Sequence, residues 1–492
     1  MTTCCEELHH DSHLSPGFYW LGNNTLKVSF LLHKENRERF VQRFLSNNKN
    51  IDDNSFLLLK GGESTTDYES DHEPLFRQEK FFFWGFGVSI TDCYGLISLN
   101  SNGKAESVLV VPNFPQDYAV WFGTIHGKEH WKSIFLVDHV LFPEEMKDWL
   151  HARGTKTLYT LDGNVNSDSG QSLHKPTFAG IDEFTLDNKT AYNDYTECRV
   201  IKSAKEMDVI RYAVDATVAS HMKVMKEIKA GMKEYQCEST YLHNAYSEWG
   251  CRNTGYTCIC AANKNGAILH YGHAGEPNAS TLKSGSLCLY DMGSEYHGYT
   301  ADVTITFPVN GIFTDDQKLV YNAVLDANRQ VIANIKPGVA WLDMHLLAER
   351  VILEHLVKGG LLKGSVEDLV KNDVGLVFFP HGLGHFFGLD THDVGGYLDN
   401  APKKVHSLRT TRTLKSGMCI TVEPGCYFID HLLNNLVLEK PQFVNIEVLQ
   451  RFRGFGGIRL EDDILVTDNG SENLSAALPR TVEEIEKFMS KN

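Results

Sequence analysis

The chain has 492 residues and a formal net charge of −16, with 42% hydrophobic and 22% charged residues. This length exceeds one ordinary hydrophobic core, so two domains are expected, and the composition is that of a globular protein in water. The acidic balance argues against nucleic acid or an anionic membrane surface as the main partner. The sequence contains no apolar run near the roughly 20 residues that span a bilayer.

Eleven cysteines, an odd number, are scattered along the chain. A secreted disulfide framework would be denser and even in number. Cys258 and Cys260 lie two apart on a predicted strand, which is typical of ordinary packing, although a redox or zinc role stays open. The first residues, MTTCCEELHHDSHL, lack the basic and apolar regions of a signal peptide. These features predict reduced cysteines and a cytoplasmic location.

The segment from Gly17 to about Asp187 mixes predicted strands and helices, which indicates an α/β domain. Its aromatic run at residues 81–84 is typical of a core, while a flank of a substrate pocket or a subunit contact stays open. The segment shows no nucleotide loop and no cluster of metal ligands. Its predicted strands lie at 56–59, 94–99, 107–111 and 156–161.

Two capping boxes predict the starts of two long helices. Ser203-x-x-Glu206 precedes apolar residues at helical spacing, and a domain boundary is expected just before it, near residues 188–200. Thr314-x-x-Gln317 opens the second long helix in the same way.

The two predicted helices end in similar phrases, IKAGM at 228–232 and IKPGV at 335–339. Each phrase is followed by a second predicted helix and then by a strand-rich block, at 253–310 and 376–465. The shared order of helix, helix and strands indicates a duplicated domain.

The stretch 285–307 predicts two strands joined by a tight turn. With the turn centred between Tyr296 and His297, Asp291 lies directly opposite Asp302 on one face of the hairpin. Two adjacent carboxylates among apolar residues repel each other, and such a pair persists if it shares a proton or holds a cation. We therefore hypothesise that the hairpin is half of a metal site and expect the site assignment to depend on this register.

Four further stretches combine histidines, carboxylates and glycines. Glycines between His381 and His385 argue against a helix, so this pair is not a zincin helix. Glu423 taken alone is consistent with the end of a strand, and FGG at 455–457 lacks the lysine and helix of a phosphate loop. The stretches are LHYGH at 269–273, PHGLGH at 380–385 with HDVGG at 392–396, TVEPG at 421–425 and GGIRLEDD at 456–463.

Four carboxylates and one imidazole stand out in short strand-like or glycine-flanked segments: Asp291, Asp302, His385, Glu423 and Glu461. This oxygen-rich set suits a pair of hard or borderline divalent ions such as Mn²⁺ better than a closed structural zinc site. Two ions roughly 3.5–4 Å apart share a hydroxide and polarise a carbonyl, which serves amide hydrolysis.

The order Asp, Asp, His, Glu, Glu in DMG…TADVT, HGLGH…HDVGG, VEPG and IRLEDD resembles the metallopeptidases of the pita-bread fold. WLGNNTLKV, LFRQEKFFFWGFGV, LHYGHAG and VLQRFRGFGGIRLEDD are most similar to the prolidase family of Xaa-Pro dipeptidases. The resemblance runs from about Gly17 to the C-terminus and includes all five ligand positions. It implies an α+β fold, with a creatinase/aminopeptidase P-like domain at 1–190 and a duplicated pita-bread catalytic domain at 191–492.

The resemblance also implies a role for each ligand at two Mn²⁺ ions per subunit. Asp302 and Glu461 bridge both ions in this scheme. Asp291 binds one ion alone, and His385 and Glu423 bind the other. Glu423 also shuttles protons for the catalytic hydroxide.

Five further residues have roles by the same resemblance. His270 and His392 hydrogen-bond the substrate and the tetrahedral intermediate. Arg409 pairs with the C-terminal carboxylate of the substrate, and a bidentate grip there enforces dipeptide length. Tyr256 lines the pocket, and Arg459, counted with the substrate-binding residues, supports the site from beside the last ligand.

The implied activity is hydrolysis of Xaa-Pro dipeptides by a homodimer. A tertiary Xaa-Pro amide has no N–H, and a site that polarises the carbonyl by metal does not need that donor. An aminopeptidase P acting on longer peptides is the alternative enzyme. A non-catalytic binding protein on the same fold is the alternative from another class.

Overall fold

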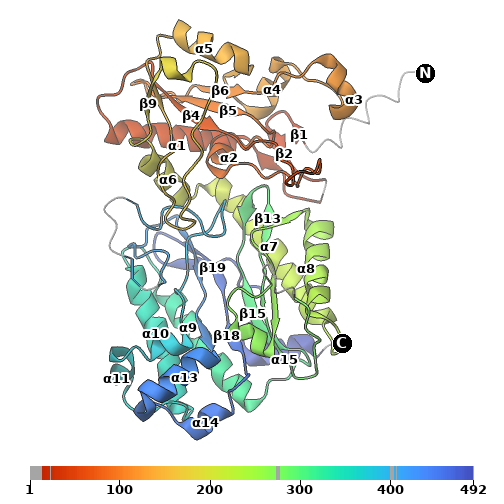
Figure 1. The fold of residues 1–492 in the computed structure, drawn as a ribbon, viewed down its shortest axis with the longest axis vertical. Coiled ribbons are helices and arrows are strands. Elements are labelled where there is room, and N and C mark those ends of the chain that lie inside the picture. The colour runs from red at the N-terminus through yellow and green to blue at the C-terminus, as the bar shows by residue number, and fades with distance from the viewer. Residues whose placement is uncertain (1–13, 23, 273–277, 399–403, 406, 491–492) are drawn as a thin grey trace, which may run out of the picture. The chain divides into compact units, whose positions relative to one another are not determined.

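The computed structural model describes residues 14–490 except 23, 273–277, 399–403 and 406, and it divides into two compact units, Met1–Met207 and Asp208–Asn492 (Figure 1). The boundary predicted at residue 190 stays a prediction. Each unit combines helices with sheets, in agreement with the predicted α+β class. Among the described helices, none has both the length and the apolar character needed to cross a membrane.

A six-stranded mixed sheet organises the first unit, and all four predicted strands belong to it. β4, β5 and β6 pair antiparallel, whereas β6–β7, β4–β8 and β8–β9 pair parallel. Its strands, in spatial order, are β7 (His139–Leu141), β6 (Ser107–Val110), β5 (Tyr94–Ser98), β4 (Phe56–Lys60), β8 (Thr157–Tyr159) and β9 (Thr185–Asp187). A smaller sheet contains β1 (Leu14–Ser15), β2 (Phe18–Tyr19) and β3 (Val28–Ser29).

Helices surround the larger sheet, which explains why its central strands are apolar on both faces. Met146 and Leu150 of α5 (Pro143–Ala152) pack in one core cluster with residues of β4, β5 and β6. The aromatic run forms α2 (Lys80–Phe86), where residues 81–84 are buried, so the prediction of a core segment is confirmed. The remaining helices are α1 (Leu31–Asn47), α3 (Ala119–Phe122), α4 (Lys128–Phe135) and α6 (Tyr192–Val200).

The second unit repeats one order of elements. The first copy contains α7 (Ala204–Glu227), α8 (Glu234–Trp249), β10 (Asn253–Thr254), β11 (Ile259–Ala262), β12 (Leu287–Asp291), β13 (Ser294–Tyr296), β14 (Tyr299–Thr300) and β15 (Thr304–Pro308). The second copy contains α9 (Asp315–Asn334), α10 (Trp341–Lys358), α11 (Val366–Lys371), α12 (Gly375–Phe378), β16 (Cys419–Val422), β17 (Gly425–Tyr427), α13 (Asp430–Glu439), α14 (Ile446–Gln450), β18 (Gly457–Arg459), β19 (Asp462–Val466) and β20 (Ser471–Asn473), before α15 (Val482–Met489).

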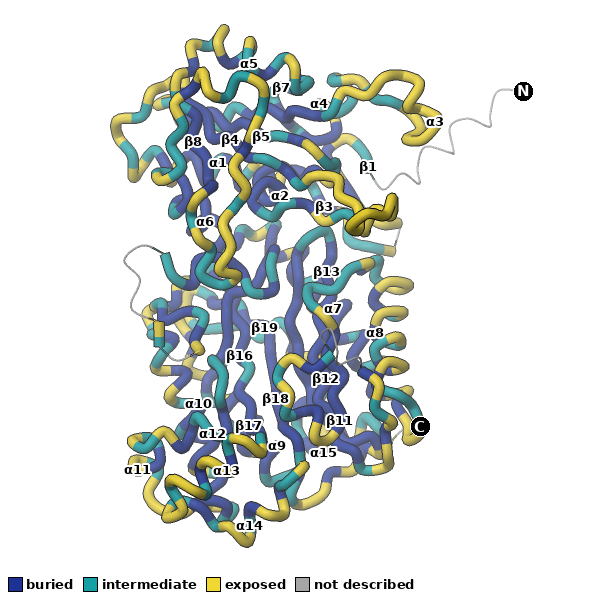
Figure 2. Tube along the Cα trace, in the orientation of Figure 1, coloured by how far each residue is buried: buried dark blue, intermediate teal, exposed yellow. Residues whose placement is uncertain are grey.

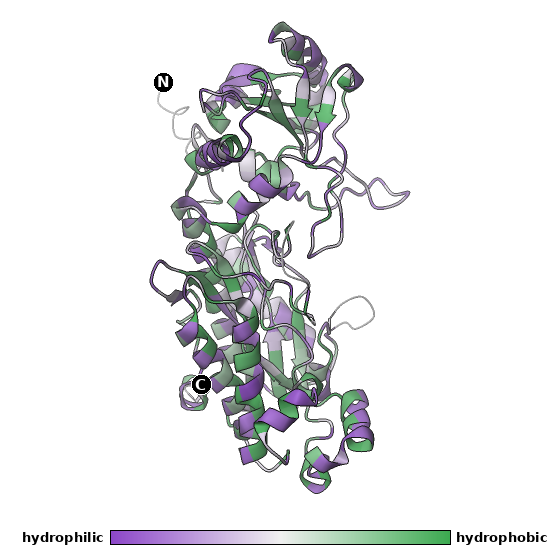
Figure 3. Cartoon of the chain, turned by 90° about the vertical axis from the view of Figure 1, so that its left-hand side faces the viewer, coloured by the Kyte–Doolittle hydropathy of each residue, from purple (hydrophilic) through white to green (hydrophobic). Residues whose placement is uncertain are grey.

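Three-stranded antiparallel sheets form the centre of each copy, in the order β11-β12-β15 and β16-β19-β20. The tube in Figure 2 shows β11, β12, β16 and β19 as largely buried. Figure 3 shows both polar and apolar colours on the surrounding helices, as amphipathic helices packed on a sheet require. Short sheets β10-β13-β14 and β17-β18 lie alongside.

Both predicted capping boxes are present. The Ser203 amide donates to the Glu206 carboxylate at 2.8 Å, and the Glu206 amide donates back to Ser203 Oγ at 3.2 Å. Thr314 and Gln317 make the same reciprocal pair at the start of α9. The local pattern in the sequence thus identified both helix starts correctly.

Matching backbone bonds after the first long helix of each copy confirm the predicted duplication. In both copies a glycine amide donates to a leucine carbonyl at 2.9 Å, and the leucine amide donates to the residue after the glycine at 2.8 Å. Both glycines have positive φ, 92° and 90°. The matched residues are Gly231, Met232 and Leu282 in the first copy and Gly338, Val339 and Leu414 in the second.

The hairpin that carries the two aspartates exists, but its predicted register is wrong. Asp291 pairs with Thr304, not with Asp302. The two-residue turn is formed by His297 and Gly298, whose φ angles are 44° and 83°. Positive φ at both positions is the signature of a type I′ turn, which favours glycine at the second position. Gly298 was therefore the signal for the correct turn.

The corrected register shifts the partner of Asp291 by two residues, which preserves the face of every side chain. Asp302 thus remains on the same side as Asp291, one diagonal step away, a separation still within reach of a shared site. Direct opposition of the two aspartates is therefore not found, and the site assignment that was expected to depend on it stays a prediction.

Candidate metal centre

The predicted ligands come from strand ends in both copies of the repeat. Asp291 ends β12, Asp302 lies between β14 and β15, Glu423 follows β16, and Glu461 lies between β18 and β19. The amide of Glu461 donates to the carbonyl of Thr304 at 3.1 Å, so the segments that carry Asp302 and Glu461 are joined by a backbone bond.

The glycine-rich segment that carries His385 lies alongside β16, where Phe386 forms an isolated antiparallel bridge with Ile420. The Thr421 amide donates to the His385 carbonyl at 2.9 Å, and the Glu423 amide donates to the Leu383 carbonyl at 2.8 Å. Thr421 Oγ1 accepts from the His385 amide at 3.1 Å. A Cβ at Gly384 would lie 2.0 Å from the Thr421 carbonyl oxygen, so this close pairing requires glycine.

Asp302, His385 and Glu461 form a compact buried trio whose ligand atoms all lie within 4.8 Å of one another. His385 Nε2 lies 3.4 Å from Asp302 Oδ2 and 3.5 Å from Glu423 Oε1. His385 Nδ1 lies 3.0 Å from the Phe386 carbonyl, which fixes the proton on Nδ1 and leaves Nε2 as a lone-pair donor.

Asp291 is linked to this trio through neighbouring side chains. Its Oδ2 accepts from Arg459 at 2.5 Å, and its Oδ1 accepts from the hydroxyl of Tyr256, which also hydrogen-bonds Asp302. Arg459 donates further to the Tyr427 hydroxyl at 2.9 Å. Tyr256 and Arg459, two of the five residues predicted to bind substrate, thus both contact a predicted carboxylate ligand directly.

Asp302, Glu423 and Glu461 have raised pKa values because burial disfavours their charged forms. Burial and neighbouring carboxylates raise the pKa of Glu461 well above its usual range, and burial raises the pKa of Glu423 to about 7 despite the opposing charges of His385 and Arg459. Burial also raises the pKa of Asp302. So much negative charge in one buried place is stabilised by divalent cations, and oxygen-rich donors with one imidazole fit hard or borderline ions.

Sequence reasoning assigned no role to His381 and Tyr427, which connect the centre to Arg459. His381 Nε2 accepts from the Tyr427 hydroxyl at 2.8 Å, and its Nδ1 lies 2.8 Å from the Gly382 carbonyl and 3.8 Å from Glu423 Oε2. Burial and the charge of Arg459 lower the pKa of His381 to about 3, so the ring is neutral. Tyr427 lies in an ordinary apolar strand and had no signal in the sequence.

The remaining predicted residues surround the trio. His392 packs edge-on against His385, with ring centroids 4.4 Å apart. Burial and the charges of His385, Arg409 and His270 lower the pKa of His392 to about 2, so the ring is neutral. His270 is exposed and Arg409 is half-buried, as expected for groups that face an incoming substrate.

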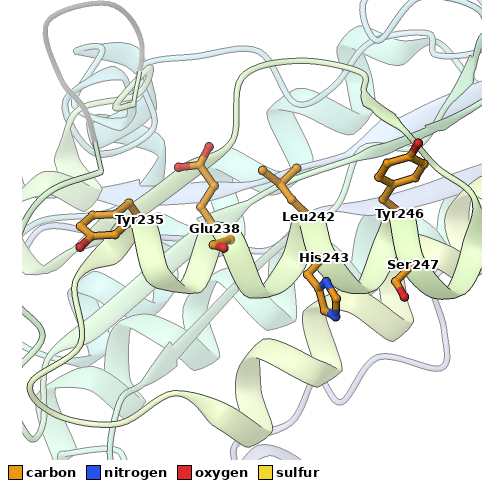
Figure 4. Close-up of a pocket in the computed structure, with 7 residues that line it drawn as sticks. Tyr235, Glu238, Leu242, His243, Tyr246 and Ser247 are labelled. Carbon is orange, nitrogen blue, oxygen red and sulfur yellow. The ribbon is translucent and has the colours of Figure 1, made fainter.

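An open pocket of about 610 Å³ lies elsewhere, along the outer side of α8 (Figure 4). Its lining includes Tyr235, Glu238, Leu242 and Tyr246 and none of the predicted site residues. Cys258 and Cys260 are buried free thiols, and Cys260 Sγ lies 3.6 Å from Met292 Sδ, which agrees with packing.

The fold and the acidic centre define a metallopeptidase, and comparison with known proteins agrees. Residues 208–468 match metallopeptidase family M24, and residues 33–159 match the aminopeptidase P N-terminal domain. The chain belongs to metallopeptidase family M24 and has the predicted pita-bread fold with an N-terminal aminopeptidase P-like domain.

Among curated relatives, the chain is 49% identical to the Xaa-Pro dipeptidase of Rattus norvegicus and 48% identical to that of Homo sapiens, each over 96% of both chains. It is 33% identical to a probable Xaa-Pro aminopeptidase of Talaromyces marneffei, over 88% of this chain and 92% of that protein.

Among solved structures, Escherichia coli aminopeptidase P with the inhibitor Pro-Leu matches with a TM-score of 0.76 and 29% identity. The match covers 94% of this chain and 98% of that one. A zinc-substituted form of the same enzyme in complex with product gives the same values.

Proposed function

We propose that the chain is an Xaa-Pro dipeptidase that hydrolyses the imide bond at a dinuclear metal centre and releases C-terminal proline. The observation that carries this proposal is the buried trio Asp302, His385 and Glu461, with Glu423 beside it, in a chain 48–49% identical to Xaa-Pro dipeptidases. A metallopeptidase activity follows from the family, and the dipeptide substrate follows from these relatives.

Five side chains are proposed to hold two Mn²⁺ ions: Asp302 and Glu461 between them, Asp291 on one, and His385 and Glu423 on the other. Bound ions would supply an activated water and polarise the scissile carbonyl. The choice of Mn²⁺ is supported by the oxygen-rich donor set and its single imidazole.

Glu423 is proposed to move the proton of the reaction. Its Oε1 lies 3.5 Å from His385 Nε2, which places a carboxylate acceptor beside the centre, within reach of the proton of a water bound there. Neutral His392 beside His385 can hydrogen-bond the developing negative charge on the substrate, and exposed His270 can act with it.

Arg409 is proposed to bind the C-terminal carboxylate of the substrate. Its charge contributes to the lowered pKa of His392, and its side chain is half-buried. A cation that binds the C-terminal carboxylate of the substrate selects a two-residue peptide, because a longer peptide places its carboxylate elsewhere.

Hydrolysis of Gly-Pro, compared with Gly-Pro-Gly-Gly, tests the substrate assignment with added Mn²⁺. We expect turnover of the dipeptide and at least tenfold lower kcat/KM for the tetrapeptide. Preference for the tetrapeptide would support the aminopeptidase P alternative, which the 33% identical fungal relatives represent, and would remove the role given to Arg409. Metal-replete protein without activity on any Xaa-Pro peptide would favour a binding protein.

A homodimer is proposed for the working enzyme. An aromatic segment at 114–122 is unusually exposed, with Val120 80%, Trp121 82% and Phe122 61% accessible, and such patches mark association sites. Light scattering after chromatography should give twice the chain mass, and Trp121→Ser with Phe122→Ser should shift it to the monomer. A monomeric wild type would refute the proposal.

A cytoplasmic location is also proposed. It is supported by nine described cysteines that are all free and buried, as expected in a reducing compartment. Fractionation of cells that express the natural protein tests it, and enrichment outside the cytosol would contradict it.

A further inference from the structure

His221 on α7 and Asn328 on α9 occupy the same position in the two copies of the repeat. Each lies ten residues before the matched glycine, Gly231 or Gly338, whose backbone bonds define the duplication. Both side chains are buried, His221 1% and Asn328 3% exposed. The duplication thus places one polar side chain from each long helix beneath the central strands of its own copy.

His221 bonds the two backbone segments that carry the aspartates. Its Nε2 lies 3.0 Å from the Met292 carbonyl oxygen and 3.0 Å from the Val303 carbonyl oxygen. Because both partners are acceptors, Nε2 carries a proton that they share. Burial lowers the pKa of His221 to about 4, so the ring is neutral and buries no charge.

Asn328 makes the corresponding connection in the second copy. Its side-chain amide donates to the Val422 carbonyl at 3.1 Å and to the Asp462 carboxylate at 3.0 Å. The two amide hydrogens are therefore both used. Ser475 and Arg480 also donate to Asp462, at 2.6 Å and 2.7 Å, and hold that carboxylate in place.

In both copies the bonded residues are a cross-strand pair that flanks the ligands. The Met292 amide donates to the Val303 carbonyl, and Val422 is the ladder partner of Asp462. Met292 and Val303 directly follow the ligands Asp291 and Asp302. Val422 precedes Glu423 and Asp462 follows Glu461.

We propose that His221 and Asn328 are symmetry-related positioning residues for the two ions. His221 fixes the spacing of Asp291 and Asp302, and Asn328 fixes the spacing of Glu423 and Glu461. Each of the two side chains holds the backbone at the chain neighbours of two ligands. The position of that backbone determines the direction in which each ligand carboxylate points. The inference rests on the proposed dinuclear centre and adds that the ligands proposed for one ion alone, Asp291 and Glu423, are each supported within their own copy of the repeat.

Stepwise binding of Mn²⁺ to chelator-treated full-length protein, measured by calorimetry, tests the proposal. The variants His221→Leu and Asn328→Leu replace the hydrogen-bond donors by an apolar side chain of similar size. We expect each to weaken mainly one binding step, a different step for each variant, by roughly tenfold to a hundredfold, the range for residues that orient metal ligands. Excess Mn²⁺ should restore most of kcat on Gly-Pro.

Asp291→Asn and Glu423→Gln assign the two steps. In a double-mutant cycle, His221→Leu should couple with Asp291→Asn and be additive with Glu423→Gln, and Asn328→Leu should do the reverse. The reciprocal exchanges His221→Asn and Asn328→His keep a hydrogen-bond donor and should recover part of the lost metal affinity. These two variants also test the proposal if a leucine variant does not fold.

Two variants control for damage to the same helices. Ser220→Ala removes a buried hydroxyl that bonds the Ala216 carbonyl within α7, and Val331→Ala opens a cavity beside α9. Both should lower the melting temperature without changing either binding step. If the two leucine variants and these two control variants all weakened both binding steps equally, the role of His221 and Asn328 would be merely structural, and the proposal would be overturned. A wild type that binds fewer than two ions would instead refute the dinuclear centre.

Discussion

The two copies of the repeat share a scaffold but differ in what they add to it. Both begin with a capped long helix, turn at a glycine of positive φ, and present a three-stranded antiparallel sheet. In the first copy, a short hairpin joins Asp291 to Thr304. In the second, α13 and α14 are inserted between the paired strands β17 and β18.

The two copies also differ in the side chains that they bring to the centre. The first copy brings two aspartates and Tyr256 to the centre. The longer second copy brings an imidazole, two glutamates and the buried cation Arg459, which bonds back to Asp291 of the first copy. Duplication therefore explains the symmetric positions of the strands, whereas the imidazole of His385 and the cation of Arg459 belong to the second copy alone.

The largest effect is expected from Glu461→Ala, which removes the ligand proposed to touch both ions. Loss of several kcal/mol of metal-derived stabilisation predicts activity below about one-thousandth of wild type. Metal analysis should show both ions lost. Retained stoichiometry would refute the bridging role, and Glu447→Ala on exposed α14 serves as the matched control.

Arg459→Met tests the link between the copies. The variant leaves the Asp291 carboxylate buried without its cation, and breaking a buried pair in this way costs about 3–5 kcal/mol. Denaturant unfolding of the metal-free protein should show this loss. Unchanged stability would mean that the copies are held together without this pair. Arg453→Met, which removes a more exposed pair with Asp430, should have little effect.

The metal-free protein should lose stability as pH rises. Glu423 has a folded pKa of about 7 against an ordinary 4.5, so between these values the folded state binds more protons than the unfolded state. The contribution of Glu423 to the free energy of unfolding is present below about pH 4.5 and lost above pH 7, and it amounts to at most about 3 kcal/mol. Asp302 and Glu461 shift in the same direction.

Denaturant midpoints at pH 5 and pH 8, with and without Mn²⁺, measure this dependence. Added metal should remove most of it, because bound cations replace the protons. Glu423→Gln should reduce the slope in the metal-free protein. Equal midpoints at the two pH values would contradict the expectation.

The smallest effect tests whether the copies are equivalent. Gly231→Ala and Gly338→Ala each place a methyl in open space at nearly equal positive φ. Each should therefore cost about 1 kcal/mol from backbone conformation alone. Costs that differ more than twofold would show that the matched turns are not energetically equivalent.

The sequence alone determined the helix starts and the duplication, and it supplied the order of the proposed ligands. Capping boxes and apolar periodicity depend on a few neighbouring residues, so Ser203, Glu206, Thr314 and Gln317 could be interpreted without a fold. The family resemblance extended this to the substrate class.

Only the tertiary structure decided which residues meet. The hairpin register depended on the φ angles of His297 and Gly298, and the contacts of Arg459 with Asp291 and Tyr427 join residues far apart in the chain. The raised pKa of Glu423 likewise results from burial that no local pattern encodes. Residue types are therefore local information, whereas distances, burial and charge balance arise only when both copies of the repeat pack around one centre.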